Sequence, residues 1–224
     1  ALAGLYVYAR YRKTKNDEDA VDDADAIVPR KNAAEELRAV VDGLRGSLPV
    51  EAAITHAHPD HIGGVVDKDG KLVFENADYY ISETEYKFWM SEEPDFSQGT
   101  KNEFSDFEIQ FARDHFKPIE DKLSFYADEA ELFGFLKLEH APGHTPGHTI
   151  ITISSGDEEL VHIADTFQHI MLIEYPEWGN QIDSDFELGI KTRKDVLEKL
   201  SSTKKLFFGD HLPFPGLGFI QKTE

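Results

Sequence analysis

The chain contains no cysteine among its 224 residues. This absence excludes disulfide bonds, thiolate metal sites and a cysteine nucleophile, so nitrogen and oxygen atoms must hold any metal ion. The chain also lacks an apolar run of roughly 18 residues, the length that a membrane-spanning helix needs. We therefore expect no membrane partner. The compartment stays open between the cytoplasm and the periplasm or exterior.

Basic residues are scarce, since 23 Lys and Arg stand against 43 Asp and Glu, for a net charge of -20. Such a surface repels phosphate backbones, so we expect a small-molecule substrate and no nucleic-acid partner. The acidic segment 16–25 is interpreted as a solvated loop, because its spacing fits no calcium-binding pattern. No internal repeat divides the chain. We expect one domain over residues 1–224, with an atypical segment at 1–31.

Helical and strand patterns alternate along the chain. Asn32 and Glu35 form a capping-box pattern that predicts a helix, which Gly46 ends. Further helices are predicted after residue 83, over 104–125 with an interruption at Pro118, and over 188–200. The predicted strands are 50–55, 71–74, 79–82, Leu136–His140, 149–154, 160–164 and 205–208. This alternation indicates a layered α/β domain with chemistry carried at strand ends.

The segment THAHPDHIGG carries the strongest signal, with His56, His58, Asp60 and His61 directly after an apolar strand. In an extended segment His56 and His58 point to the same side. Pro59 then breaks the strand, so Asp60 and His61 face another way. One segment thus offers two ligand pairs to two neighbouring positions, with donors suited to zinc, iron, cobalt or manganese. A surface histidine tract is the weaker interpretation, because Gly-Gly closes the loop after a buried strand.

Three later residues extend this set. His144 lies in the loop APGHTPGHT, Asp165 ends the strand LVHIAD, and His211 lies in FFGDHLPF. Asp165 alone would be interpreted as a helix N-cap. Beside a histidine-rich site, however, its carboxylate can bridge two cations about 3.5–4 Å apart. The other histidines are expected to support the site or the core, or to lie on the surface: His115, His140, His148 and His162.

The ordered pattern of these residues resembles the metallo-β-lactamase superfamily from about Asn32 to the end. The segments EYKFW, YPEW with a later Asp183, and HLPFPGLG make it most similar to the branch of methyl parathion hydrolase and related lactonases and esterases. The resemblance implies a four-layer αββα sandwich and two divalent ions, with zinc first and iron, manganese or cobalt as alternatives. It assigns His56, His58 and His144 to one ion. It assigns Asp60, His61 and His211 to the other, with Asp165 bridging both.

The N-terminal region departs from this resemblance. The family opens with several strands and an Asp-Thr-Gly turn, whereas the nearest counterpart here is the segment 22–25 within residues 1–31. The N-terminal sheet is therefore expected to be shortened, altered or missing.

The implied activity is hydrolysis of an ester, lactone or phosphotriester by a hydroxide that bridges the two ions. Asp60 is expected to be the catalytic proton acceptor. The candidate lining of the substrate pocket comprises Phe88, Trp89, His169, Tyr175, Trp178 and Phe214. The aromatic members of this set are equally compatible with simple core packing, and exposed aromatics would favour a homodimer.

Two other functions stay open. A glyoxalase II-like thioesterase would share all seven ligands, but it should add a helical, basic C-terminal region, and few residues follow His211. A non-catalytic binding protein on the same fold is disfavoured, because such proteins usually lose ligands and all seven are present.

Overall fold

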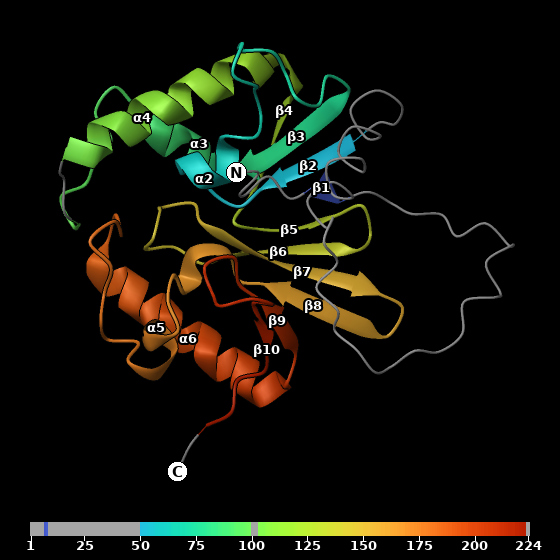
Figure 1. Cartoon of the computed structure of the whole chain (residues 1–224), viewed down its shortest axis with the longest axis vertical. Coiled ribbons are helices and arrows are strands. Elements are labelled where there is room, and N and C mark those ends of the chain that lie inside the picture. Colours follow the sequence, from blue (N-terminus) through green and yellow to red (C-terminus); the bar gives the residue numbers. More distant parts are fainter. Residues whose placement is uncertain (1–6, 9–49, 100–102, 223–224) are drawn as a thin grey trace, which may run out of the picture.

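A computed structural model of the chain describes residues 7–8, 50–99 and 103–222. The helix expected from Asn32, the acidic segment 16–25 and the counterpart of the Asp-Thr-Gly turn lie outside the described residues. Within the described part, two β-sheets lie against each other, and helices cover the outer face of each (Figure 1).

The N-terminal sheet has four described strands. Their order is β1 (Val7–Tyr8), β2 (Val50–Ile54), β3 (Ala77–Ser82) and β4 (Leu123–Tyr126). β1 pairs antiparallel with β2, and the other pairs are parallel. The helices of this half are α2 (Pro59–Ile62), α3 (Glu83–Met90), α4 (Glu103–Phe116) and the 3₁₀ segment η1 (Lys117–Lys122). α3 and α4 cover the outer face of the sheet (Figure 1).

The C-terminal sheet has six strands. Their order is β10 (Leu217–Gly218), β9 (Leu206–Phe208), β8 (Glu158–His162), β7 (Thr149–Ser155), β6 (Leu136–His140) and β5 (Glu129–Leu132). Its helices are the 3₁₀ turn η2 (Ala164–Thr166), α5 (Met171–Glu174) and α6 (Phe186–Thr203). None of the described helices combines the length and the apolar character that a membrane crossing demands.

Side chains alternate between the two faces of each sheet, as the two-residue period of a strand requires. Ala52 and Ile54 pack with the residues of α3 and α4, whereas Ala53 between them faces the other sheet. In the same way, Ile150 packs towards α6 and Ile151 packs between the sheets. The layers therefore follow the order helix, sheet, sheet, helix. The expected αββα sandwich is confirmed.

Two predictions of local structure are wrong. Residues 71–74 form no strand, only a single bridge between Val66 and Leu72. A turn occupies this region instead, because the Asp67 carboxylate accepts the backbone N–H groups of residues 69 and 71. The helix predicted over 104–125 ends at Phe116 and gives way to η1 and then β4. β4 becomes a strand because it pairs with β3, a contact that the apolar pattern of the segment does not reveal.

Candidate metal centre

The seven residues expected to bind metal converge at one edge of the two sheets. They form two groups, each of which could hold a metal ion. One group contains His56, His58, His144 and Asp165, and the other contains Asp60, His61, Asp165 and His211. Within each group the candidate ligand atoms all lie within 4.8 Å of one another. Asp165 belongs to both groups, which is the arrangement expected of a carboxylate shared by two ions.

The turn after β2 divides its ligands between the groups. Pro59 is the first residue of α2, and the N–H groups of His61 and Ile62 both donate to the carbonyl of His58. This change from extended to helical backbone turns Asp60 and His61 away from the direction of the preceding histidines. The division predicted from Pro59 is therefore the observed one.

Several nitrogen and oxygen atoms that could bind a metal ion at the centre are buried and lack hydrogen-bond partners within the described residues. These include His56 Nε2, His61 Nε2 and Asp165 Oδ1. His61 Nε2 lies only 2.8 Å from Asp165 Oδ1 without hydrogen-bond geometry. Buried polar atoms without partners are costly. Their convergence fits a cation, and neutral imidazole with carboxylate is a donor set that suits zinc and related divalent ions.

The protonation states of three residues in the first group favour metal binding in the metal-free chain: His56, His58 and Asp165. Burial lowers the pKa of His56 and His58 well below the ordinary value for histidine. Both rings therefore stay neutral and keep a lone pair for a cation. Burial raises the pKa of Asp165, but interactions with the imidazoles of His144, His211 and His61 outweigh this and leave it well below its usual value. The shared carboxylate is consequently ionised.

A second layer of residues orients these ligands. His144 Nδ1 lies 3.0 Å from Asp183 Oδ1, and Arg193 donates to the other oxygen of the same carboxylate at 3.0 Å. The backbone N–H of Asp165 donates to His148 Nε2 at 3.0 Å, while His148 Nδ1 donates to the carbonyl of Ala141. His148 thus supports the site without joining either group, as the sequence predicts.

Close packing against α6 shapes the loop that carries His144. Gly143 has a φ of +123°, and a Cβ atom there would lie 2.3 Å from the backbone nitrogen of Gly189 on α6. A side chain would therefore clash with the helix, and the backbone conformation itself favours glycine. The glycine lets the loop approach α6 closely enough for His144 to reach Asp183.

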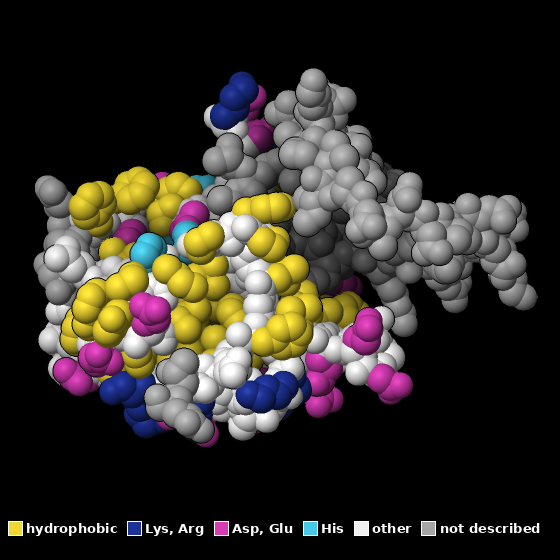
Figure 2. Space-filling model, turned by 60° about the horizontal axis from the view of Figure 1, so that its bottom comes forward, with side chains coloured by type: hydrophobic (Ala, Val, Ile, Leu, Met, Phe, Trp, Pro, Cys, Tyr) yellow, Lys and Arg dark blue, Asp and Glu magenta, His cyan; other side chains and the backbone are white. Residues whose placement is uncertain are grey.

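A cavity of about 270 Å³ opens onto the centre. It is lined by His58, Pro59, Asp60, Glu108, Asp165, Gln168, Ile182 and His211. On the face shown in Figure 2, hydrophobic side chains gather around exposed histidine and acidic side chains. Ile182 is itself an exposed hydrophobic residue at this cavity. Most residues that line this cavity are polar or charged, and Pro59 and Ile182 are its apolar members.

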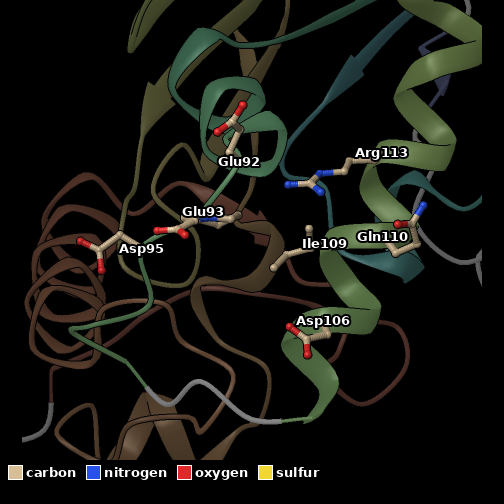
Figure 3. Close-up of a pocket in the computed structure, with 8 residues that line it drawn as sticks. Glu92, Glu93, Asp95, Asp106, Ile109, Gln110 and Arg113 are labelled. Atoms are coloured by element: carbon tan, nitrogen blue, oxygen red, sulfur yellow. The ribbon is translucent and has the colours of Figure 1, made fainter.

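A larger hollow, of about 700 Å³, lies elsewhere (Figure 3). It is lined by Glu92, Glu93, Pro94, Asp95, Asp106, Ile109, Gln110 and Arg113. It shares no residue with the cavity at the metal centre, and none of its lining residues belongs to either ligand group. The larger of these two cavities is therefore not the one at the candidate metal ligands.

The residues predicted to line the substrate pocket lie elsewhere. Trp89 is fully buried in the core, where Phe88 packs against it, and its ring meets that of His58 at a centroid distance of 5.5 Å. The remaining four, all exposed, are His169, Tyr175, Trp178 and Phe214. None of the six is among the described residues that line the cavity. The cavity walls that sequence reasoning missed are Glu108, Gln168 and Ile182.

The family model of the metallo-beta-lactamase superfamily matches residues 42–215. AidC, a dizinc quorum-quenching lactonase solved in complex with the product N-hexanoyl-L-homoserine, is 41% identical at a TM-score of 0.73, over 77% of this chain and 60% of its own. The hydrolase AbOPH of the beta lactamase superfamily is 26% identical at a TM-score of 0.70, over 78% of this chain and 60% of its own.

A quorum-quenching N-acyl homoserine lactone lactonase shares the fold at 20% identity and a TM-score of 0.55, over 83% of this chain and 70% of its own. The chain spans about 60% of the length of AidC and of AbOPH. No curated protein matches it. Because the family model covers most of the chain and the structure has the αββα order, the chain belongs to the metallo-β-lactamase superfamily.

Proposed function

We propose that this chain is a binuclear metal-dependent hydrolase whose preferred substrate is a neutral lactone with an apolar substituent. The observation that carries the proposal is the position of Asp165, shared by two groups of ligands at the floor of a cavity. The similarity to AidC, a lactonase that was solved with its ring-opened product, favours a lactone over other esters.

The residues of the two groups have separate roles in this proposal. His56, His58 and His144 hold one ion, Asp60, His61 and His211 hold the other, and Asp165 contacts both. Zinc is the expected metal, and the same donors also accept iron, manganese or cobalt. Two divalent ions at such a site supply a water molecule of lowered pKa and an electrophile for the substrate carbonyl.

Asp60 is proposed to receive the proton that the attacking water loses. Its carboxylate lines the cavity, and its side chain is 42% exposed, so it can face both substrate and solvent. Burial raises the pKa of Asp60, but the hydrogen bond from His211 and the charge of His61 together outweigh this, so the pKa lies below its usual value. The group therefore starts ionised and able to accept a proton.

The net charge of the chain and the lining of the cavity favour an uncharged substrate. The net charge of -20 repels anions in general, and Glu108 adds a carboxyl group at the cavity itself. Ile182 offers an apolar contact at the opening. Hydrolysis converts a neutral lactone into an anionic hydroxy acid. The carboxylates of the chain should therefore repel the lactone less than they repel an anionic substrate.

The test is a substrate panel assayed on zinc-loaded and chelator-treated protein. The panel contains N-hexanoyl-homoserine lactone, a γ-lactone without a side chain, a p-nitrophenyl ester, a phosphotriester and a thioester. We expect the acylated lactone to give the highest kcat/KM and chelation to abolish its turnover. His211→Asn should reduce kcat by at least about 100-fold, whereas the matched change His115→Asn on α4 should have little effect.

Each other outcome has a defined meaning. A preference for the thioester would favour a glyoxalase II-like activity. A preference for the phosphotriester would indicate phosphotriester hydrolysis, one of the three activities expected from the sequence. Binding of the lactone without turnover by zinc-loaded protein would favour a non-catalytic binding protein. Chelator-insensitive turnover would contradict a metal-dependent mechanism.

A further inference from the structure

Glu85 is a fully buried carboxylate beside the metal centre that belongs to neither ligand group. It lies in the first turn of α3 and accepts four hydrogen bonds. Oε1 accepts the backbone N–H of Ala57 at 3.0 Å and Trp89 Nε1 at 2.7 Å. Oε2 accepts the hydroxyl of Thr145 at 2.6 Å and the backbone N–H of Gly147 at 2.9 Å.

Three of these partners, Ala57, Thr145 and Gly147, come from the two loops that carry the histidines of the first group. Ala57 stands between His56 and His58, and Thr145 directly follows His144. One oxygen of Glu85 therefore holds the loop after β2, and the other holds the loop before β7. Trp89 adds a second link, because its indole N–H is fixed by Glu85 while its ring packs edge-on against His58.

The fit of the second loop against α3 is tight. A Cβ atom at Gly147 would lie 2.2 Å from the backbone nitrogen of Glu85, so only glycine permits this approach. The side chain of Glu85 is thus enclosed between α3 and both loops. Its position cannot shift without moving one of them.

All four partners are donors, and a carboxylate is the side chain that can accept from all of them. An amide of the same shape has one oxygen and one NH₂ group. Turned one way, the NH₂ group faces the N–H groups of Ala57 and Trp89 and leaves both without an acceptor. Turned the other way, it leaves the backbone N–H of Gly147 without an acceptor and reverses the hydrogen bond of the Thr145 hydroxyl. Replacing Glu85 with glutamine therefore keeps the volume of the side chain but breaks one of the two links between the loops.

We propose that Glu85 is a positioning residue of the metal centre, which holds the loop of His56 and His58 in register with the loop of His144. The proposal rests on the proposed metal-dependent function. Glu85 makes no contact with the reacting atoms in this account and acts only through the ligands that it aligns. Residues that orient metal ligands in this way typically change metal affinity by about 10- to 100-fold when they are replaced.

The test compares Glu85→Gln with Glu83→Gln, a matched change two residues earlier on α3. Glu83 is exposed and forms a surface ion pair with Lys87, so its loss should be nearly neutral. Metal affinity is measured by calorimetric titration with zinc, and ligand geometry by the absorption spectrum of the cobalt-substituted protein. We expect Glu85→Gln to weaken the tighter zinc site by about 10- to 100-fold and to alter the cobalt spectrum. Glu83→Gln should match the wild type in both.

A Glu85→Gln protein that is folded by circular dichroism but keeps wild-type zinc affinity and cobalt spectrum would overturn the proposal. If Glu85→Gln does not fold, Thr145→Val is tested instead. It removes one of the two hydrogen bonds to Oε2 and leaves the carboxylate in place. Thr145→Val should then weaken zinc binding by a few-fold, and unchanged affinity would equally overturn the proposal. A wild-type chain that binds no metal would instead contradict the proposed function, so the two failures are distinguishable.

Discussion

The buried carboxylate of Asp183 joins His144 to Arg193. One of its oxygens lies 3.0 Å from His144 Nδ1, and the other accepts Arg193 Nη1 at 3.0 Å. Arg193 and Asp183 are each only 2% exposed, so their charges compensate each other away from water. The carboxylate fixes the ring of His144 with Nε2 directed towards Asp165.

Asp183→Asn should therefore weaken zinc binding by about 10- to 100-fold, because the amide holds His144 less strongly and leaves the charge of Arg193 without its partner. The measurement is calorimetric zinc titration of the purified variant. Asp195→Asn is the matched control, since Asp195 lies on the same helix and pairs only with Lys191 at the surface. Equal zinc affinity in both variants would show that Asp183 does not orient the ligand.

Metal binding should release protons and strengthen as the pH rises. In the metal-free chain, hydrogen bonds to Asp165 and Asp60 raise the pKa of His211 to about 10. Burial lowers the pKa of His144, but hydrogen bonds to Asp165 and Asp183 outweigh it and raise the value to about 9. Both rings are protonated at pH 7 and must lose that proton to bind an ion.

About two protons should consequently leave per chain on zinc loading at pH 7, one from each of these histidines. Titration in buffers of different ionisation enthalpy measures this number. His56 and His58 contribute none, because their low pKa already leaves them neutral. Zinc affinity that is independent of pH between 6 and 8 would contradict this assignment.

Gly143→Ala should lower both stability and metal affinity. The new Cβ would lie 2.3 Å from the backbone of Gly189, in a conformation with a φ of +123°. Backbone strain and the clash together should reduce the free energy of unfolding by at least about 2 kcal/mol. Denaturant unfolding of the metal-free protein measures this change. The loop turn at Gly156 has open space around it, so Gly156→Ala should show only the smaller conformational penalty.

Glu108 should discriminate against anionic substrates. It is a half-buried carboxyl group on α4 that lines the cavity together with Asp60 and Asp165. Glu108→Gln should raise kcat/KM for an anionic ester by about 3- to 10-fold relative to a neutral one. Burial raises the pKa of Glu108, so the difference should grow as the pH rises and the group ionises.

Glu93→Gln is the matched control, because Glu93 lines the separate hollow of Figure 3. It should leave the ratio of the two substrates unchanged. The same ratio in wild type and Glu108→Gln would remove Glu108 from the account of specificity.

The seven candidate ligands could be predicted because local sequence carries them, whereas their full division between two ions came from the resemblance to the metallo-β-lactamase superfamily. His56, His58, Asp60 and His61 lie within one strand end and one turn, and Pro59 marks where the backbone changes. His144, Asp165 and His211 each follow an apolar strand. These strands, β6, β8 and β9, run in the same direction, so their carboxyl ends lie at one edge of the sheet. The alternation of helices and strands predicts a layered α/β domain, whereas the αββα order came from the resemblance to the metallo-β-lactamase superfamily.

The supporting residues could not be predicted in this way. Ser82 and Glu85 form the pattern of an ordinary capping box, in which the glutamate would bind the start of its own helix. The structure instead directs Glu85 to partners 28 and 60 residues away in the sequence. Nothing local to Trp89 indicates that it is enclosed in the core, nor does the segment at 123–126 indicate that it pairs with β3. Each depends on contacts between distant segments.

The number of zinc ions bound per folded chain tests the central claim most directly. Native mass spectrometry of the zinc-loaded protein should show two ions, and Asp165→Asn should lose one or both because its carboxylate is shared by the two groups. A saturated wild-type chain with a single zinc ion, or with none, would contradict a binuclear centre.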